Sequence, residues 1–248
     1  MLTTLEEKVD PKHAALLVVD MQNDFCHQEG VTALNGAGVA TAQGIVPTLR
    51  HLIDEAQRLG MLVAFIRTTH GERTDSEARV EQRRSRKFPH NCVEGTWGAD
   101  WYAGMEPGPG DLVVTKHRYS AFINTDLDLI LRARRIRTVV MAGTDTSVCV
   151  ESTARDGFML DYYVVFLNDC TAASDPEAHQ ATLKTIRRQF GVVCDAADVI
   201  QAWEPVQSPS VQAQSSGDQL LRMEGPGRRI LLGGVQGVSP WFETEPPL

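Results

Sequence analysis

Residues 138–158 read TVVMAGTDTSVCVESTARDGF, and this stretch decides the fold. The continuous apolar run at 138–142 indicates a strand that is buried on both faces. A small, polar turn follows at 143–148, and the segment 150–160 is predicted as a helix. A strand that passes through a short turn into a helix is the repeating unit of parallel α/β sheets.

The same alternation continues on both sides of this stretch. The apolar runs predict strands at 14–19, 61–66, 111–115, 138–142, 162–167 and 191–194. Helical spacing predicts helices at 44–59, 127–134, 150–160, 176–190 and 196–203, with Asp175 as the N-cap before Pro176. Repeated strand–helix units predict an α/β fold, a three-layer, doubly wound, mostly parallel sheet with helices on both faces.

Two segments depart from this alternation. The polar stretch 68–110 has no clear periodicity, and a loop region of that length is typical of a functional lid. The composition changes after residue 204, where Pro, Ser and Gln become frequent. We therefore divide the chain into one domain at 1–204 and a C-terminal extension at 205–248, which we expect to pack on its own domain or on a neighbouring subunit.

Charge and composition exclude several classes of protein. The net charge is −8 and no long basic face is present, which disfavours nucleic acid and anionic membranes as partners. The short basic cluster at 83–87 is interpreted as a solvated helix end. The beginning of the chain lacks a signal peptide, and no apolar run reaches the ~20 residues that span a bilayer. Five cysteines without a CxxC pair indicate reduced thiols in a cytoplasmic protein and no structural zinc.

Three reactive side chains follow predicted strands. Asp20 ends the first strand, Lys116 ends the strand that reads DLVVTK (111–116), and Cys149 lies in the turn after 138–142. In open parallel sheets, ligands bind at the carboxyl ends of the strands, so these residues should converge. Spacing alone leaves them as one candidate set among several, because Cys26, Cys92 and His70 also fall in loops.

The three residue types suit nucleophilic catalysis. A helix N-terminus and a nearby lysine both favour the thiolate of Cys149, and Asp20 can take a proton and pass it to a leaving amine. Backbone N–H groups of Asp145 and Cys149 can form an oxyanion hole. The ordinary alternatives are a core cysteine, a turn-forming aspartate and a solvated lysine.

The segments VVDMQNDF (18–25), KHRYSAF (116–122) and AGTDTSVCVESTARDGF (142–158) occur in that order at strand ends. With them the chain resembles the isochorismatase-like cysteine hydrolases over about residues 14–200. The resemblance implies a doubly wound α/β fold and an Asp–Lys–Cys triad, which Asp20, Lys116 and Cys149 match. It also implies a non-proline cis peptide bond at Thr144–Asp145.

Branches of this family can be separated by chemistry. Isochorismatases proper lack the cysteine, so Cys149 argues against that branch. Nicotinamidases carry a metal-binding Asp-x-His where this chain reads RTTHGERTDSE (67–77), with His70 alone, so we expect no metal and no cofactor. The patterns KxRYSxFxNTxLDxILR and VCVESTxRDGF look shared with ureidoacrylate amidohydrolases, to which biuret, triuret and N-carbamoylsarcosine hydrolases are related.

The expected substrate is therefore a small ureido or carbamoyl compound. Phe25, Tyr119 and Phe122 are candidate pocket walls, with core packing as an equal alternative. Asn23 and Glu151 are weaker candidates, and Glu151 can equally serve as a cap or an ion-pair partner. We expect a homo-oligomer, a dimer or a tetramer. A nicotinamidase-like amidase and a catalytically silent partner-binding protein stay open as alternatives.

Overall fold

Six parallel strands form the centre of the molecule, and a computed structural model describes residues 1–204. The strands are β1 (Ala14–Val19), β2 (Leu62–Thr68), β3 (Leu112–Lys116), β4 (Thr138–Thr144), β5 (Tyr163–Ala172) and β6 (Gly191–Cys194). Their order in the sheet is β3-β2-β1-β4-β5-β6, and every neighbouring pair is parallel. The direction of winding therefore reverses between β1 and β4, which confirms the predicted doubly wound sheet.

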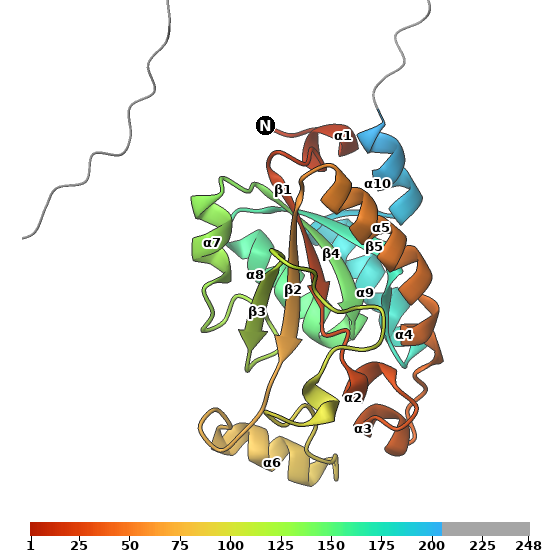
Figure 1. Ribbon diagram of the computed structural model, residues 1–248, viewed down its shortest axis with the longest axis vertical. Helices are drawn as coiled ribbons and strands as arrows, with labels where there is room; N and C mark the ends of the chain where they lie inside the picture. Colours follow the sequence, from red (N-terminus) through yellow and green to blue (C-terminus); the bar gives the residue numbers. More distant parts are fainter. Residues whose placement is uncertain (205–248) are drawn as a thin grey trace, which may run out of the picture. The chain divides into compact units, whose positions relative to one another are not determined.

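Helices cover both faces of the sheet (Figure 1). They are α1 (Leu5–Lys8), α2 (Asn23–Cys26), α3 (Val31–Leu34), α4 (Ala40–Gly44), α5 (Val46–Arg58), α6 (Glu77–Ser85), α7 (Leu127–Ala133), α8 (Glu151–Met159), α9 (Pro176–Gln189) and α10 (Ala196–Trp203). A short 3₁₀ turn at Trp97–Ala99 and a π-helical turn at Thr146–Val150 complete the set.

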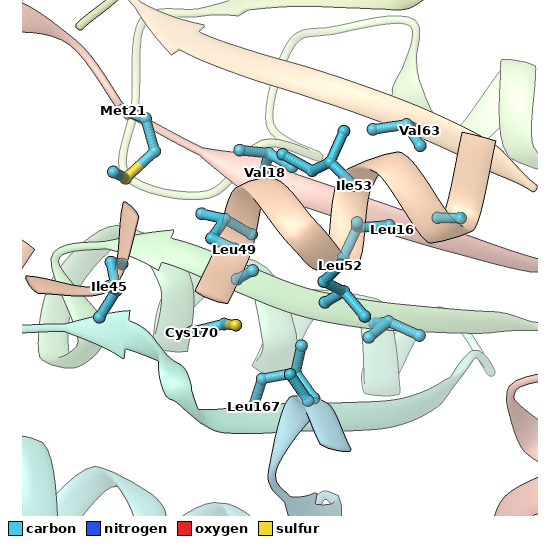
Figure 2. Close-up of a cluster of buried hydrophobic side chains, with 14 of the residues drawn as sticks. Leu16, Val18, Met21, Ile45, Leu49, Leu52, Ile53, Val63, Leu167 and Cys170 are labelled. Atoms are coloured by element: carbon cyan, nitrogen blue, oxygen red, sulfur yellow. The ribbon is translucent and has the colours of Figure 1, made fainter. Parts of the chain in front are cut away.

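Alternate residues of the buried strands point to two separate cores. Leu16 and Val18 of β1 pack in the core that includes α5 and α10, whereas Leu17 packs with α7, α8 and α9. Figure 2 shows Leu49 and Leu52 of α5 beside Leu16 and Val18. Because β1 is fully buried on both faces, its end is a rigid platform for the residue that follows it.

The structure corrects three of the predicted elements. Residues 77–85 form α6, which Ser76 caps, within the stretch predicted as irregular. The sequence did not reveal this helix, because it buries no residue and so has no apolar pattern. The predicted helix 44–59 is confirmed as α5, but its start is corrected, because α4 ends at Gly44 and α5 begins at Val46 with proline in its first turn. β5 continues to Ala172, because its polar end still pairs with β4 after a register shift.

The basic cluster at 83–87 lies at the end of α6, as interpreted from the sequence. Within residues 1–204, none of the helices combines the length and the apolar character that a membrane span requires. The predicted packing of the extension 205–248 lies outside the described residues.

Candidate active site

The carboxyl ends of β1, β3 and β4 bring three predicted residues together. Asp20 follows β1 in a left-handed conformation with φ 53°, which aspartate tolerates better than most residues. Lys116 is the last residue of β3, and Cys149 lies in the π-helical turn after β4. Asp20 and Lys116 are fully buried, whereas Cys149 retains 8% exposure. Of the three residues, Cys149 is thus the one that is least deeply buried.

A buried ion pair forms the base of the site. Nζ of Lys116 lies 2.8 Å from Oδ2 of Asp20 and also donates a hydrogen bond of 3.1 Å to the carbonyl oxygen of Arg118. Burial raises the pKa of the Asp20 carboxyl, although the charge of Lys116 offsets part of this effect. Burial acts to lower the pKa of Lys116, but the charges of Asp20 and Cys149 and the hydrogen bonds to them together raise that pKa. Lys116 therefore stays a cation, and Asp20 is a stronger base than an exposed aspartate.

The turn that carries Cys149 is held by its own polar groups. The side chain of Asp145 accepts hydrogen bonds from the N–H and the hydroxyl of Ser147, at 2.9 and 2.8 Å. The N–H groups of Val148 and Val150 both donate to the carbonyl oxygen of Asp145. The peptide bond between Thr144 and Asp145 is cis, as the resemblance implied.

The protonation state of Cys149 differs from the sequence-based expectation. Burial raises the pKa of the thiol well above its ordinary value, Lys116 lowers it in part, and the negative charge of Asp20 raises it further. Lys116 therefore favours the thiolate, as expected, but burial and the charge of Asp20 outweigh this effect. Because Asp20 neutralises the lysine, the arrangement favours a thiol with a carboxylate base beside it.

Two buried residues that hold the backbone around the site, Gln22 and Thr153, were not predicted. The side chain of Gln22 donates to the carbonyl oxygens of Thr68 and Ala99, at 2.9 and 2.8 Å, and accepts from the N–H of Thr68. The hydroxyl of Thr153 donates to the carbonyl oxygen of Cys149 at 2.7 Å and accepts from the N–H of Ala121 at 3.0 Å. Both residues are buried polar groups within the quoted motifs, and that signal could have identified them.

The predicted substrate contacts separate into two groups. Phe122 is buried and stacks on a tyrosine with centroids 5.8 Å apart, and Phe25 packs against the core on the α5 side. The amide of Asn23 donates to the backbone at 2.9 Å. Glu151 contacts an arginine at 2.6 Å and also accepts from a threonine hydroxyl. These four have structural partners. Tyr119 is 40% exposed and lines a cavity, and its hydroxyl donates a hydrogen bond to the side-chain oxygen of Gln82 at 3.1 Å.

His70 and His90 approach one carboxylate, yet their surroundings do not fit a metal ion. His70 lies 3.8 Å and His90 lies 3.0 Å from oxygens of Asp75. Arg79 and Arg83 hold the same carboxylate at 3.4 and 3.1 Å, and two guanidinium groups repel a cation. Within residues 1–204, no three His, Cys, Asp or Glu side chains are arranged as a metal site. We therefore derive no step through a metal.

Comparison with known proteins agrees with this geometry. Residues 14–198 match the model of the isochorismatase domain. A cysteine hydrolase from Pseudomonas syringae pv. phaseolicola 1448A is 29% identical, with a TM-score of 0.70 over 79% of this chain and 94% of that chain. N-carbamoylsarcosine amidase from Thermoplasma acidophilum is 30% identical, with a TM-score of 0.61 over 74% and 96% of the two chains. Pyrazinamidase of Pyrococcus horikoshii in complex with zinc is 27% identical, with a TM-score of 0.64 over 74% and 99%. The chain therefore belongs to the isochorismatase family of hydrolases.

Proposed function

We propose that the chain is a cysteine-dependent amidohydrolase that cleaves a C–N bond of a small ureido or carbamoyl compound, of the biuret, triuret, ureidoacrylate or N-carbamoyl type. The observation that carries this proposal is the buried Asp20–Lys116 ion pair beside the thiol of Cys149. The likeness to N-carbamoylsarcosine amidase supports the substrate class. We also expect a cytoplasmic homo-oligomer.

In the first half of the proposed reaction, Sγ of Cys149 attacks the substrate carbonyl carbon while its proton passes to Asp20. The raised pKa of Asp20 suits this transfer, because a base is most effective when its pKa approaches the working pH. The N–H groups of Asp145 and Cys149 are the proposed donors to the oxyanion. Asp20 then gives the proton to the leaving nitrogen, and ammonia or an amine departs.

The second half hydrolyses the thioester. A water attacks the acyl carbon, Asp20 accepts one of its protons, and the proton returns to the sulfur as the C–S bond breaks. Lys116 remains protonated throughout, because its raised pKa and its contact with Asp20 both favour the cation. Its role in this scheme is to fix the carboxylate and to balance its charge.

Ammonia release tests the proposal. Biuret, triuret, ureidoacrylate, N-carbamoylsarcosine and nicotinamide are offered to the wild type, to Cys149→Ser and to the matched control Cys194→Ser, whose half-buried cysteine lies on β6. We expect Cys149→Ser to lower kcat/KM by at least about a thousand-fold and the control to change it by less than about two-fold. Intact-mass spectrometry of quenched reactions should show the acyl adduct on the wild type.

Other outcomes select the alternatives. Turnover of nicotinamide alone would replace the ureido class by a ring carboxamide but retain Cys149. No turnover of any compound by a folded protein would favour a catalytically silent member of the family. Equal activity of Cys149→Ser and wild type would refute the mechanism.

A further inference from the structure

A small cavity lies between α6 and the turn that carries the nucleophile. Its volume is about 190 Å³, and its wall includes Tyr119 and Val148, the residue before Cys149. Pockets for drug-sized ligands commonly measure about 300–1,000 Å³, so this one suits a metabolite of few heavy atoms. Figure 1 shows α6 beyond the carboxyl ends of β2 and β3, where Lys116 ends its strand.

One face of α6 brings positive charge to this cavity. Arg79, Arg83 and Arg86 are spaced by four and three residues, so they lie on the same side of the helix, and all three line the cavity. Arg84, Arg86 and Lys87 are all exposed, and of these three only Arg86 lines the cavity. The basic cluster at 83–87 is therefore not only a solvated helix end, because two of its members, Arg83 and Arg86, also line the cavity.

The charge in the cavity is not balanced by the protein. Asp75 contacts Arg79 and Arg83, at 3.4 and 3.1 Å. Arg86 makes no ion pair with any of residues 1–204. No residue that lines the cavity is acidic. A concave site with excess positive charge attracts anions.

Asn91 independently indicates a ligand. The residue is only 8% exposed and lines the same cavity, yet its side-chain amide has no hydrogen-bond partner in the described part of the chain. Its amide atoms are not among the fully buried polar atoms that lack a partner, so they remain accessible and are free to bind a ligand in the cavity. Its NH₂ group can donate to an anionic oxygen.

We propose that Arg86 and Asn91 bind a carboxylate of the substrate, so that the enzyme prefers ureido or carbamoyl acids to neutral compounds such as biuret. A guanidinium fork matches the two oxygens of a carboxylate, and the amide of Asn91 adds a third donor. The cavity wall at Val148 then directs the carbamoyl end of the same molecule toward Cys149. This assignment rests on the proposed function and makes the substrate class narrower.

Matched acid and neutral substrates test the assignment. Ureidoacrylate and N-carbamoyl-β-alanine are compared with their N-methylamides, with ammonia release as the readout so that only loss of the carbamoyl nitrogen is counted. The variants are Arg86→Gln, Arg86→Lys, Asn91→Asp and the control Arg84→Gln, which lies on the same helix outside the cavity. Circular dichroism checks that each variant folds.

We expect the wild type to prefer an acid over its N-methylamide by at least about ten-fold in kcat/KM, with the difference mainly in KM. Arg86→Gln and Asn91→Asp should lower kcat/KM for the acid by about 10- to 100-fold and leave that for the N-methylamide nearly unchanged. Arg86→Lys should restore part of the preference, and Arg84→Gln should match the wild type.

Two results would overturn the assignment. Equal or better turnover of N-methylamides or biuret by the wild type would refute the carboxylate site and leave the Cys149 reaction standing. So would an Arg86→Gln variant that behaves like Arg84→Gln. If neither acids nor neutral compounds release ammonia in a Cys149-dependent way, the proposed function itself fails, and this assignment fails with it.

Discussion

Replacement of Lys116 by Met should lower the free energy of unfolding, because it leaves a buried charge at the end of the sheet without a partner. Asp20 and Lys116 are both fully buried and lie 2.8 Å apart, so Lys116→Met leaves the carboxylate without its cation. Breaking a buried ion pair in this way commonly costs about 3–5 kcal/mol of folding stability. The buried carboxyl of the variant can instead take up a proton. This limits the loss of folding stability to about 1.4 kcal/mol for each pH unit above the unfolded pKa of aspartate, about 3.9.

These figures set a pH dependence with a definite sign. In the variant, the pKa of Asp20 is raised above its unfolded value, so the folded state keeps a proton that the unfolded state releases. The free energy of unfolding should therefore fall as the pH rises above about 4. We expect Lys116→Met to be less stable than wild type by about 3–5 kcal/mol at pH 8 and by at most about 1.5 kcal/mol at pH 5.

Urea unfolding followed by circular dichroism at fixed protein concentration measures this difference. Lys184→Met replaces an exposed lysine of α9 and serves as the control, with a change below about 0.5 kcal/mol at either pH. Asp20→Asn should show the opposite slope, because it leaves a buried lysine whose pKa falls below its unfolded value. Equal stability of Lys116→Met and wild type at pH 8, or a difference that does not change with pH, would refute the buried-pair argument.

Three further predictions concern the scaffold of the site. Gly143 has φ 109°, and a Cβ there would collide with the carbonyl oxygen of Val19, so Gly143→Ala should lose more than about 3 kcal/mol in urea unfolding. Gly44→Ala at an open helix position should change stability by less than about 1 kcal/mol. Thr153→Val should lose about 1–3 kcal/mol and lower kcat, because it removes the hydroxyl bonded to the Cys149 carbonyl; an unchanged kcat would separate this residue from the site. Burial acts to raise the pKa of Asp75, but a hydrogen bond from a neighbouring arginine and nearby positive charges together lower it. The stabilising contribution of this carboxylate is therefore present above about pH 4 and is lost as the pH falls through the lowered pKa. Asp75→Asn should cost about 1–3 kcal/mol of folding stability at pH 7, and its difference from wild type should shrink below pH 4.

The positions of Asp20, Lys116 and Cys149 became candidates because each follows an apolar run, and the family resemblance selected them from the other residues in loops. Such a run identifies a buried parallel strand, and the carboxyl ends of parallel strands share one edge of the sheet. The order of the strands places β1 beside β4, which brings Asp20 close to the turn that carries Cys149. Sequence pattern and fold therefore agree wherever burial decides the conformation.

The rest depended on contacts that no local pattern records. α6 buries no residue, so its helix leaves no apolar signature. The proposal for Arg86 and Asn91 depends on the cavity that they share with Tyr119 and Val148, which no local pattern records. Phe122 and Glu151 likewise show their structural partners only in three dimensions. The protonation of Cys149 depends on the combined charges of two residues distant in sequence, which spacing alone does not supply.

The protonated state of Cys149 also governs which covalent inhibitors can label this protein. Burial raises the pKa of the thiols of Cys26 and Cys194 to about 12, and it raises that of Cys149 as well. For alkylating reagents that need a preformed thiolate, the acidity of the thiol therefore gives no selectivity for Cys149. In the proposed mechanism, an electrophile shaped as a carbamoyl analogue recruits Asp20 as its base at the moment of attack. Selectivity for Cys149 then comes from proton transfer within the site and not from the intrinsic acidity of the sulfur.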